Sequence, residues 1–223
     1  MAFGVRLHVW GERALFCRPE MKVERVSYDV MPPSAARGLL EAIHWKPAIR
    51  WEVTRIHVLR PIRFQSFRRN EVSDKASIAN ARSAMKRGTT AGLGIDVAAA
   101  RQQRATLLLV DVGYVIEARF EMTGRAEPED TPAKHINMFN RRARDGQCYH
   151  RPCLGTREFA CDFRLIEEGD PWPEDTLVER DRDLGWMSYD PGYAPERPAS
   201  FFRAALEDGV LEVEKQIAGG LAG

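Results

Sequence analysis

The sequence is poor in the features that place a protein in a membrane or in an oxidising compartment. It contains only 4 cysteines among 223 residues, and no apolar run approaches the roughly 20 residues that a membrane-spanning helix needs. Its first residues, Met1 to Trp10, alternate apolar with charged side chains, whereas a secretory signal has a basic start and a long apolar stretch. We therefore expect reduced cysteines, no membrane association and a cytoplasmic location.

Several signature motifs of enzymes and binding modules are missing. Gly92-Leu93-Gly94 lacks both the preceding strand and the following Lys-Ser/Thr of a phosphate-binding loop. The Gly-x-Ser-x-Gly and His-Glu-x-x-His motifs are absent, as is the aromatic signature of a standard RNA-recognition sheet. The cysteines between Cys148 and Cys161 form no Cys-x-x-Cys pair, so they are more typical of core strands than of a zinc site. We expect neither a cofactor nor a bound metal.

The charges are distributed unevenly along the chain, although the net charge is only +1. Residues 1–110 carry 19 Lys and Arg against 9 Asp and Glu, whereas residues 111–223 carry 14 against 23. The basic excess is densest from Lys46 to Arg104, and such an arginine-rich stretch favours a phosphate-rich partner. A solvated basic face without a partner is the alternative interpretation.

Hydrophobic periodicity predicts several strands and two clear helices. Leu39, Leu40 and Ile43 recur at helical spacing behind Ser34 as a cap, so a helix is predicted over Ala35–Ile43. A second helix is predicted over Ala133–Arg144, with Thr131 as its cap and a terminal Gly146. Strands are predicted at Val5–Trp10, Trp51–Leu59, Ala105–Met122 with an interruption at Gly113, Cys148–Leu154 and Thr156–Ile166.

The order of these elements predicts the fold class. Strand, helix, strand, strand, helix and strand follow one another, which is typical of an α+β, ferredoxin-like (RRM-like) βαββαβ domain over residues 1–165. Residues 68–101 are polar and basic, and they are expected to form a long loop with a weak helix near 76–85. The acidic residues 166–223 are expected to form a small antiparallel β domain.

Three residues have the chemistry that metal-free RNA cleavage requires. Lys134 and His135 lie in the first turn of the second predicted helix, where backbone amides attract phosphate, and His44 ends the first helix. Histidine transfers protons near neutrality, and lysine stabilises the extra charge on phosphorus. Each histidine, taken alone, is more often structural or simply exposed.

The sequence also resembles a known family. Residues 27–47, 58–62 and 68–72, together with Lys134-His135 and residues 154–159, are similar to the CRISPR-associated RAMP-superfamily proteins of type I-C systems (the Cas five family, subtype d). The resemblance implies a ferredoxin-like domain with a small β domain, and metal-independent cutting of CRISPR precursor RNA within each repeat. It also implies that the protein remains on the 5′ handle of the guide RNA with other subunits of the interference complex. The family's catalytic Lys-His pair falls on Lys134 and His135, and its catalytic tyrosine falls on His44.

We therefore expect an endoribonuclease that cuts at the 3′ base of the repeat hairpin and leaves a 2′,3′-cyclic phosphate. His44, Lys134 and His135 are its expected catalytic residues. The residues expected to bind RNA are Lys46, Arg68, Arg69, Lys86 and Arg87. Two alternatives are a non-catalytic subunit that binds the 5′ handle and a metal-dependent nuclease whose partner is DNA. A solvated surface is the alternative interpretation of the basic residues.

Overall fold

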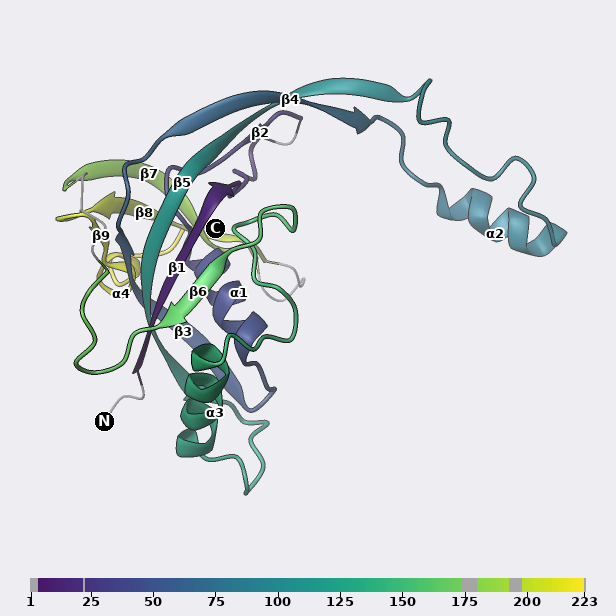
Figure 1. Ribbon diagram of the computed structural model, residues 1–223. Helices are drawn as coiled ribbons and strands as arrows, with labels where there is room; N and C mark the ends of the chain where they lie inside the picture. Colours follow the sequence, from purple (N-terminus) through teal and green to yellow (C-terminus); the bar gives the residue numbers. More distant parts are fainter. Residues whose placement is uncertain (1–3, 22, 174–179, 193–197, 223) are drawn as a thin grey trace.

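The computed structural model describes residues 4–21, 23–173, 180–192 and 198–222, and its centre is a curled sheet that is mainly antiparallel (Figure 1). The strands of this sheet are β1 (Gly4–Ala14), β2 (Arg25–Val26), β3 (Ile49–Val58), β4 (Phe64–Val72), β5 (Arg101–Met122), β6 (Asp162–Leu165) and β9 (Val210–Leu211). A separate pair consists of β7 (Arg182–Asp190) and β8 (Ser200–Leu206). The helices are α1 (Pro33–Ile43), α2 (Ile78–Arg87), α3 (Pro132–Arg144) and α4 (Val213–Ile217).

The long strand β5 holds the sheet together. It is 22 residues long, and it pairs with β1, β3 and β4 in antiparallel fashion and with β2 in parallel. The main path of the sheet is β6-β1-β5-β3-β9. Leu7 pairs with Ile116 and Trp51 with Phe120, so the alternating apolar residues of three strands bury one common face.

Helices α1 and α3 cover this apolar face (Figure 1). Leu40 and Ile43 of α1 and Phe139 of α3 are fully buried in the same core as the strand residues. The predicted mixture of helices and antiparallel strands is therefore confirmed. The two helices end up side by side over the sheet, which brings the end of α1 to the start of α3.

The signals that predicted α3 are confirmed, but the predicted cap of α1 is wrong. Thr131 Oγ1 accepts a hydrogen bond from the Lys134 backbone N–H at 3.2 Å, and Gly146 adopts the left-handed conformation with φ +66°. Ser34 lies inside α1, whose N-cap is Pro32 and makes no side-chain capping bond. The two prolines start this helix instead, because a proline at the first helical position has a suitable φ and no N–H to satisfy.

The prediction of a long loop over 68–101 is wrong for its first residues, which belong to a strand. The predicted interruption at Gly113 is also wrong, because β5 continues through it. Residues up to Val72 continue β4, which pairs with the first half of β5 beyond the edge of the covered face, and α2 follows (Figure 1). β4 consists mostly of polar side chains that are exposed or only partly buried, so no alternation of apolar residues marks it in the sequence. The helix predicted near 76–85 is confirmed as α2, with Ser77 as its cap.

The strand predicted at Cys148–Leu154 is also wrong, and the one predicted at Thr156–Ile166 is reduced to β6. Cys153 makes only an isolated bridge to Ala160. Leu154 instead accepts a hydrogen bond from the Leu15 backbone N–H at 3.0 Å, and Gly155 turns the chain with φ +90°. This contact with the end of β1 takes the place of strand pairing.

The acidic C-terminal part packs on the same core. Tyr28 Oη accepts a hydrogen bond from the Ser188 N–H at 3.2 Å, and Arg37 pairs with Asp190 at 3.3 Å. β9 adds to β3 at the edge of the sheet. The division into domains 1–165 and 166–223 remains a prediction. In the part of the chain that is described, no helix has the length and apolar character needed to cross a membrane.

Candidate active site

The structure brings His44 and His135 into direct contact, although 90 residues separate them in the sequence. His44 is the C-cap residue of α1, and His135 lies in the first turn of α3. His44 Nε2 lies 3.0 Å from His135 Nδ1. The two residues are only 0% and 1% exposed, so the pair is closed off from solvent.

Aromatic side chains hold the pair in place. Trp51 Nε1 donates a hydrogen bond to the His44 carbonyl oxygen at 2.8 Å. The Phe120 ring meets the His135 ring edge-on, with 6.2 Å between their centres. Because Trp51 and Phe120 come from the paired strands β3 and β5, the sheet fixes the position of both imidazoles.

Arg142 determines the direction of the hydrogen bonds in the pair. Its Nη1 donates to the Ile43 carbonyl oxygen at 3.0 Å and lies 3.3 Å from His44 Nδ1. A guanidinium has only donors, so Nδ1 of His44 accepts and its ring proton is on Nε2. That proton points at His135 Nδ1, so the proton of neutral His135 is on Nε2.

The Asp130 carboxylate lies next to the outer nitrogen of His135. Its Oδ1 lies 3.4 Å from His135 Nε2 and 3.3 Å from Lys134 Nζ. Its Oδ2 accepts from the Glu127 backbone N–H at 3.3 Å. One carboxylate therefore contacts both members of the Lys134-His135 pair.

The surroundings keep both imidazoles neutral near pH 7. Burial lowers the pKa of His44 from its usual 6.5 to about 4, and the neighbouring charge of Arg142 adds to this effect. Burial also lowers the pKa of His135, against the opposing effect of Asp130. The pKa of Asp130 is lowered by the hydrogen bond from Glu127 and by Lys134, so this carboxyl is ionised.

The residues expected to bind RNA lie in two places. Lys46 is exposed two residues after His44. Arg68 and Arg69 lie on β4, and Lys86 and Arg87 end α2, far from α1 and α3 (Figure 1). The structure thus gathers His44, Lys46, Lys134 and His135 and places the other four on the β4–β5 extension and α2.

One of these candidates already has a protein partner. Arg69 forms an ion pair with Glu158, and its guanidinium lies 5.5 Å from the centre of the Phe67 ring. Arg68, Lys86 and Arg87 are exposed. Arg69 therefore contacts RNA only if this ion pair opens, whereas the other three are accessible as they stand.

Asp130 and Arg142 were missed by the sequence reasoning. Weak signals exist for both: Asp130 precedes Lys134 by four residues, and Arg142 follows His135 by seven, which is two helical turns. Neither spacing indicates a role unless the position of His44 is known. That position depends on the packing of α1 against α3.

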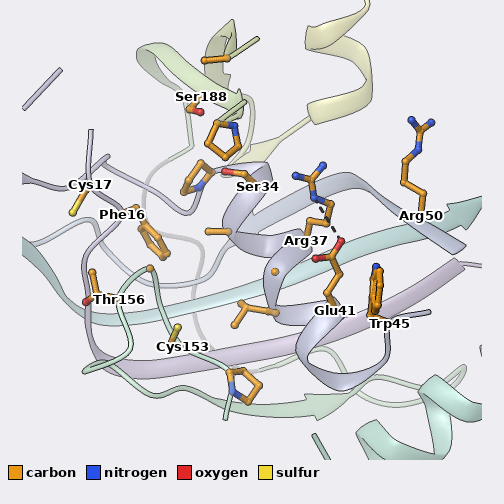
Figure 2. Close-up of a pocket in the computed structure, with 18 of the residues that line it drawn as sticks. Phe16, Cys17, Ser34, Arg37, Glu41, Trp45, Arg50, Cys153, Thr156 and Ser188 are labelled. Atoms are coloured by element: carbon orange, nitrogen blue, oxygen red, sulfur yellow. Dashed lines mark ion pairs between the residues drawn. The ribbon is translucent and has the colours of Figure 1, made fainter. Parts of the chain in front are cut away.

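A groove of about 1280 Å³ runs along the exposed side of α1 and reaches Trp45, the residue after His44, but neither His44 nor His135 lines it (Figure 2). Trp45, which follows His44, is 55% exposed and forms part of its wall. Arg37, Arg50 and Arg125 also line it, and Arg37 pairs with Glu41 at 3.9 Å. The groove thus combines an exposed aromatic ring with guanidinium groups, which suits a single nucleic-acid strand.

Comparison with known proteins gives consistent matches over nearly the whole chain. The Cas_Cas5d family model, described as CRISPR-associated protein (Cas_Cas5), matches residues 4–214. A protein of Mannheimia succiniciproducens named CRISPR pre-crRNA endoribonuclease Cas5d is 53% identical over 215 residues, covering 96% of each chain. A protein of the same name from Thermus thermophilus is 40% identical over 228 residues, covering 94% of this chain and 90% of its own.

Solved structures show the same fold. One described as "Crystal Structure of CRISPR-associated Protein" has a TM-score of 0.67 at 23% identity and covers 99% of this chain and 96% of its own. A functionally uncharacterized protein from Streptococcus mutans has a TM-score of 0.62 at 21% identity. The match covers 94% of this chain and 91% of that protein. At these identities the likeness concerns the fold alone.

Proposed function

The chain belongs to the Cas5d family of CRISPR-associated proteins, and on that premise we propose that it is an endoribonuclease that cuts the repeat hairpin of CRISPR precursor RNA. Two curated relatives carry the name of that activity, and they match 96% and 94% of this chain. The observation that carries the proposal is the contact of His44 with His135 beside Lys134 at the start of α3. These are the groups that cleavage by an RNA's own 2′-hydroxyl requires.

The proposed reaction proceeds without a metal ion. The 2′-oxygen attacks the adjacent phosphorus, the bond to the 5′-oxygen breaks, and the products are a 2′,3′-cyclic phosphate and a 5′-hydroxyl. Lys134 stabilises the additional negative charge on the phosphorane. The two histidines share the proton transfers, in which the 2′-hydroxyl loses one proton and the departing 5′-oxygen gains one: His135 faces the RNA through Nε2, and His44 exchanges a proton with His135 across their 3.0 Å contact.

RNA is proposed to contact both ends of the molecule. Lys46 and the groove beside Trp45 would hold the strand next to the cut, where the indole ring can stack on a base. The exposed Arg68, Lys86 and Arg87 would hold the backbone further away, joined by Arg69 once it leaves Glu158. After cleavage the protein remains on the 5′ handle as a subunit of the interference complex.

The finer description of the fold is part of this proposal. The elements β1, α1, β3, β5, α3 and β6 form the proposed ferredoxin-like unit, and their sheet order β6-β1-β5-β3 supports it. Residues 166–223 form the proposed small C-terminal domain.

The test is cleavage of the cognate repeat RNA by the full chain in excess EDTA. We expect cleavage with a cyclic-phosphate end, and a rate at least about 100-fold lower in Lys134→Ala and in His135→Ala. Lys215→Ala, an exposed lysine paired with Glu207, is the matched control and should leave the rate unchanged. Full rates in the Lys134 and His135 variants would refute the site.

A second candidate function is that of a guide-binding subunit without nuclease activity. The observation that favours it is the burial of both imidazoles, since every ring nitrogen faces another protein group. Tight binding of the repeat RNA without any cleavage would support this function.

The third candidate function is that of a DNA nuclease. It predicts cleavage of DNA that begins only when Mg²⁺ or Mn²⁺ is added.

A further inference from the structure

Each ring nitrogen of the two histidines lies against another protein group. His44 faces Arg142 through Nδ1 and His135 through Nε2. His135 faces His44 through Nδ1, whereas its buried Nε2 makes no hydrogen bond and lies 3.4 Å from Asp130 Oδ1. A group that acts on RNA must expose at least one nitrogen, so one of these contacts has to be given up when RNA binds.

The contact with Asp130 is the one that can open. His44 and His135 are 0% and 1% exposed, whereas the side chains of Asp130 and Lys134 are 19% and 43% exposed. The Asp130–His135 contact, at 3.4 Å, is also longer than the 3.0 Å between the two rings. Asp130 belongs to the connection between β5 and α3, so a turn of its side chain gives up the bond from the Glu127 N–H but no bond within the sheet or either helix.

The partners of the Asp130 carboxylate are those that a phosphate needs. It contacts the Lys134 ammonium and the His135 imidazole in the first turn of α3, a helix of 13 residues. A helix start, a lysine and an imidazole N–H together form an anion site. Because two anions cannot occupy it together, the carboxylate and an RNA phosphate exclude one another.

We propose that the Asp130 carboxylate occupies the position of the scissile phosphate in the RNA-free protein. It is displaced from Lys134 and His135 when RNA binds. This inference rests on the proposed function, because it assumes that Lys134 and His135 meet the phosphate. Displacement frees both groups at the same moment, which couples binding of the correct RNA to exposure of His135 Nε2. Asp130 thus competes with the substrate and has no part in the chemical step.

The test compares Asp130→Asn with the unaltered full chain. Asparagine keeps an oxygen that can accept from the Glu127 N–H, but it loses the charge that holds Lys134. The probe is the cognate repeat RNA with a 2′-deoxy sugar at the nucleotide 5′ of the cut, which binds without being cut. We expect its Kd to fall about three- to tenfold, with the single-turnover rate on the all-ribose RNA within about threefold of the unaltered protein.

Glu129→Gln is the matched control. It removes the same charge from an exposed side chain one residue away. Lys134 Nζ meets Glu129 at its backbone carbonyl oxygen, at 3.3 Å, and the substitution leaves that oxygen in place. The Kd of this variant should change less than twofold. Equal tightening in both variants would mean a general effect of charge and would overturn the inference.

Two further results would contradict the inference. A rate at least about 100-fold lower in Asp130→Asn with an unchanged Kd would make Asp130 a carboxylate that orients His135 for catalysis. An unchanged Kd and rate would mean that the carboxylate does not compete. Asp130→Ala should repeat the tighter binding, and it serves as the second variant if asparagine disturbs the loop. If the unaltered chain neither binds nor cuts the repeat RNA, the proposed function itself fails, which is a different result.

Discussion

At the scale of single residues, the environment of His44 suits a neutral imidazole. The ring is buried, accepts from Arg142 at one nitrogen and meets His135 at the other. A neutral imidazole satisfies both neighbours, whereas a protonated one would place a second cation beside Arg142. In the resting structure His44 is therefore a neutral group whose Nε2–H points at His135 Nδ1.

This burial predicts a loss of stability in acid. The folded state holds the pKa of His44 at about 4, against 6.5 when it is exposed. Between these values the unfolded chain binds the proton and the folded one does not, so the free energy of unfolding falls as pH falls. Between pH 7.5 and 5.0 this contribution decreases by about 2 kcal/mol.

Urea unfolding at the two pH values measures the effect. In His44→Gln, which cannot titrate, the dependence on pH should be weaker by the same amount, and an unchanged dependence would show that His44 is not the group responsible.

Arg142 also makes a prediction at this scale. Removing its charge in Arg142→Met should raise the pKa of His44 from about 4 towards its usual 6.5, because the guanidinium disfavours the imidazolium. Histidine-selective NMR titration measures this change. Arg141→Met, an exposed neighbour on the same helix, is the control and should leave the His44 titration where it is.

At the scale of elements, helix α3 was predictable and the β4–β5 extension was not. Thr131, Pro132 and Gly146 act within a few residues of their own position, so the sequence alone reveals them. Strand β4 of the extension carries mostly polar side chains, and its pairing with β5 depends on residues far apart in the chain. The same reason explains why Lys134 and His135 could be placed at a helix start, whereas their contacts with Asp130 and His44 could not be foreseen.

Gly155 makes a prediction for the contact between β1 and the segment that precedes β6. It has φ +90°, and a Cβ there would lie 2.6 Å from the Leu15 carbonyl carbon and closer still to the carbonyl oxygen. This carbonyl group belongs to the residue after β1, and it lies between two backbone hydrogen bonds, from Leu15 N–H to Leu154 and from Tyr28 N–H to Phe16, so it cannot shift without disturbing them. Gly155→Ala should therefore lower the free energy of unfolding by about 3 kcal/mol or more.

Gly169→Ala is the matched control, because this glycine has the same φ of +90° with no atom within 4 Å. Gly169→Ala should lower the free energy of unfolding by only about 1–2 kcal/mol, which is the cost of the left-handed conformation. Similar melting temperatures for the two variants would contradict the close contact.

At the scale of the whole molecule, the basic end of α2 and the histidine pair lie far apart (Figure 1). We expect binding and chemistry to separate accordingly. Replacing Lys86 and Arg87 together by alanine should weaken RNA binding and reduce the slope of log Kd against log salt by about 1.4, or about 0.7 for each phosphate that is no longer neutralised. The rate at saturating RNA should not change.

A filter-binding series from low to physiological salt measures this slope. The control is the double variant Arg203→Ala with Lys215→Ala, which removes two exposed cations from the C-terminal part. If both double variants weaken binding equally, the extension has no specific part in holding RNA.

The central claim is that the RNA is cut by its own 2′-hydroxyl at the site of His44, Lys134 and His135. The most direct measurement is single-turnover cleavage in EDTA of the cognate repeat RNA beside a copy with one 2′-deoxy sugar, at the nucleotide 5′ of the cut. We expect the first RNA to be cut to a cyclic phosphate and the second to be bound equally well and left intact. Cleavage of the deoxy copy at the same position, or tight binding of both without cleavage of either, would contradict it.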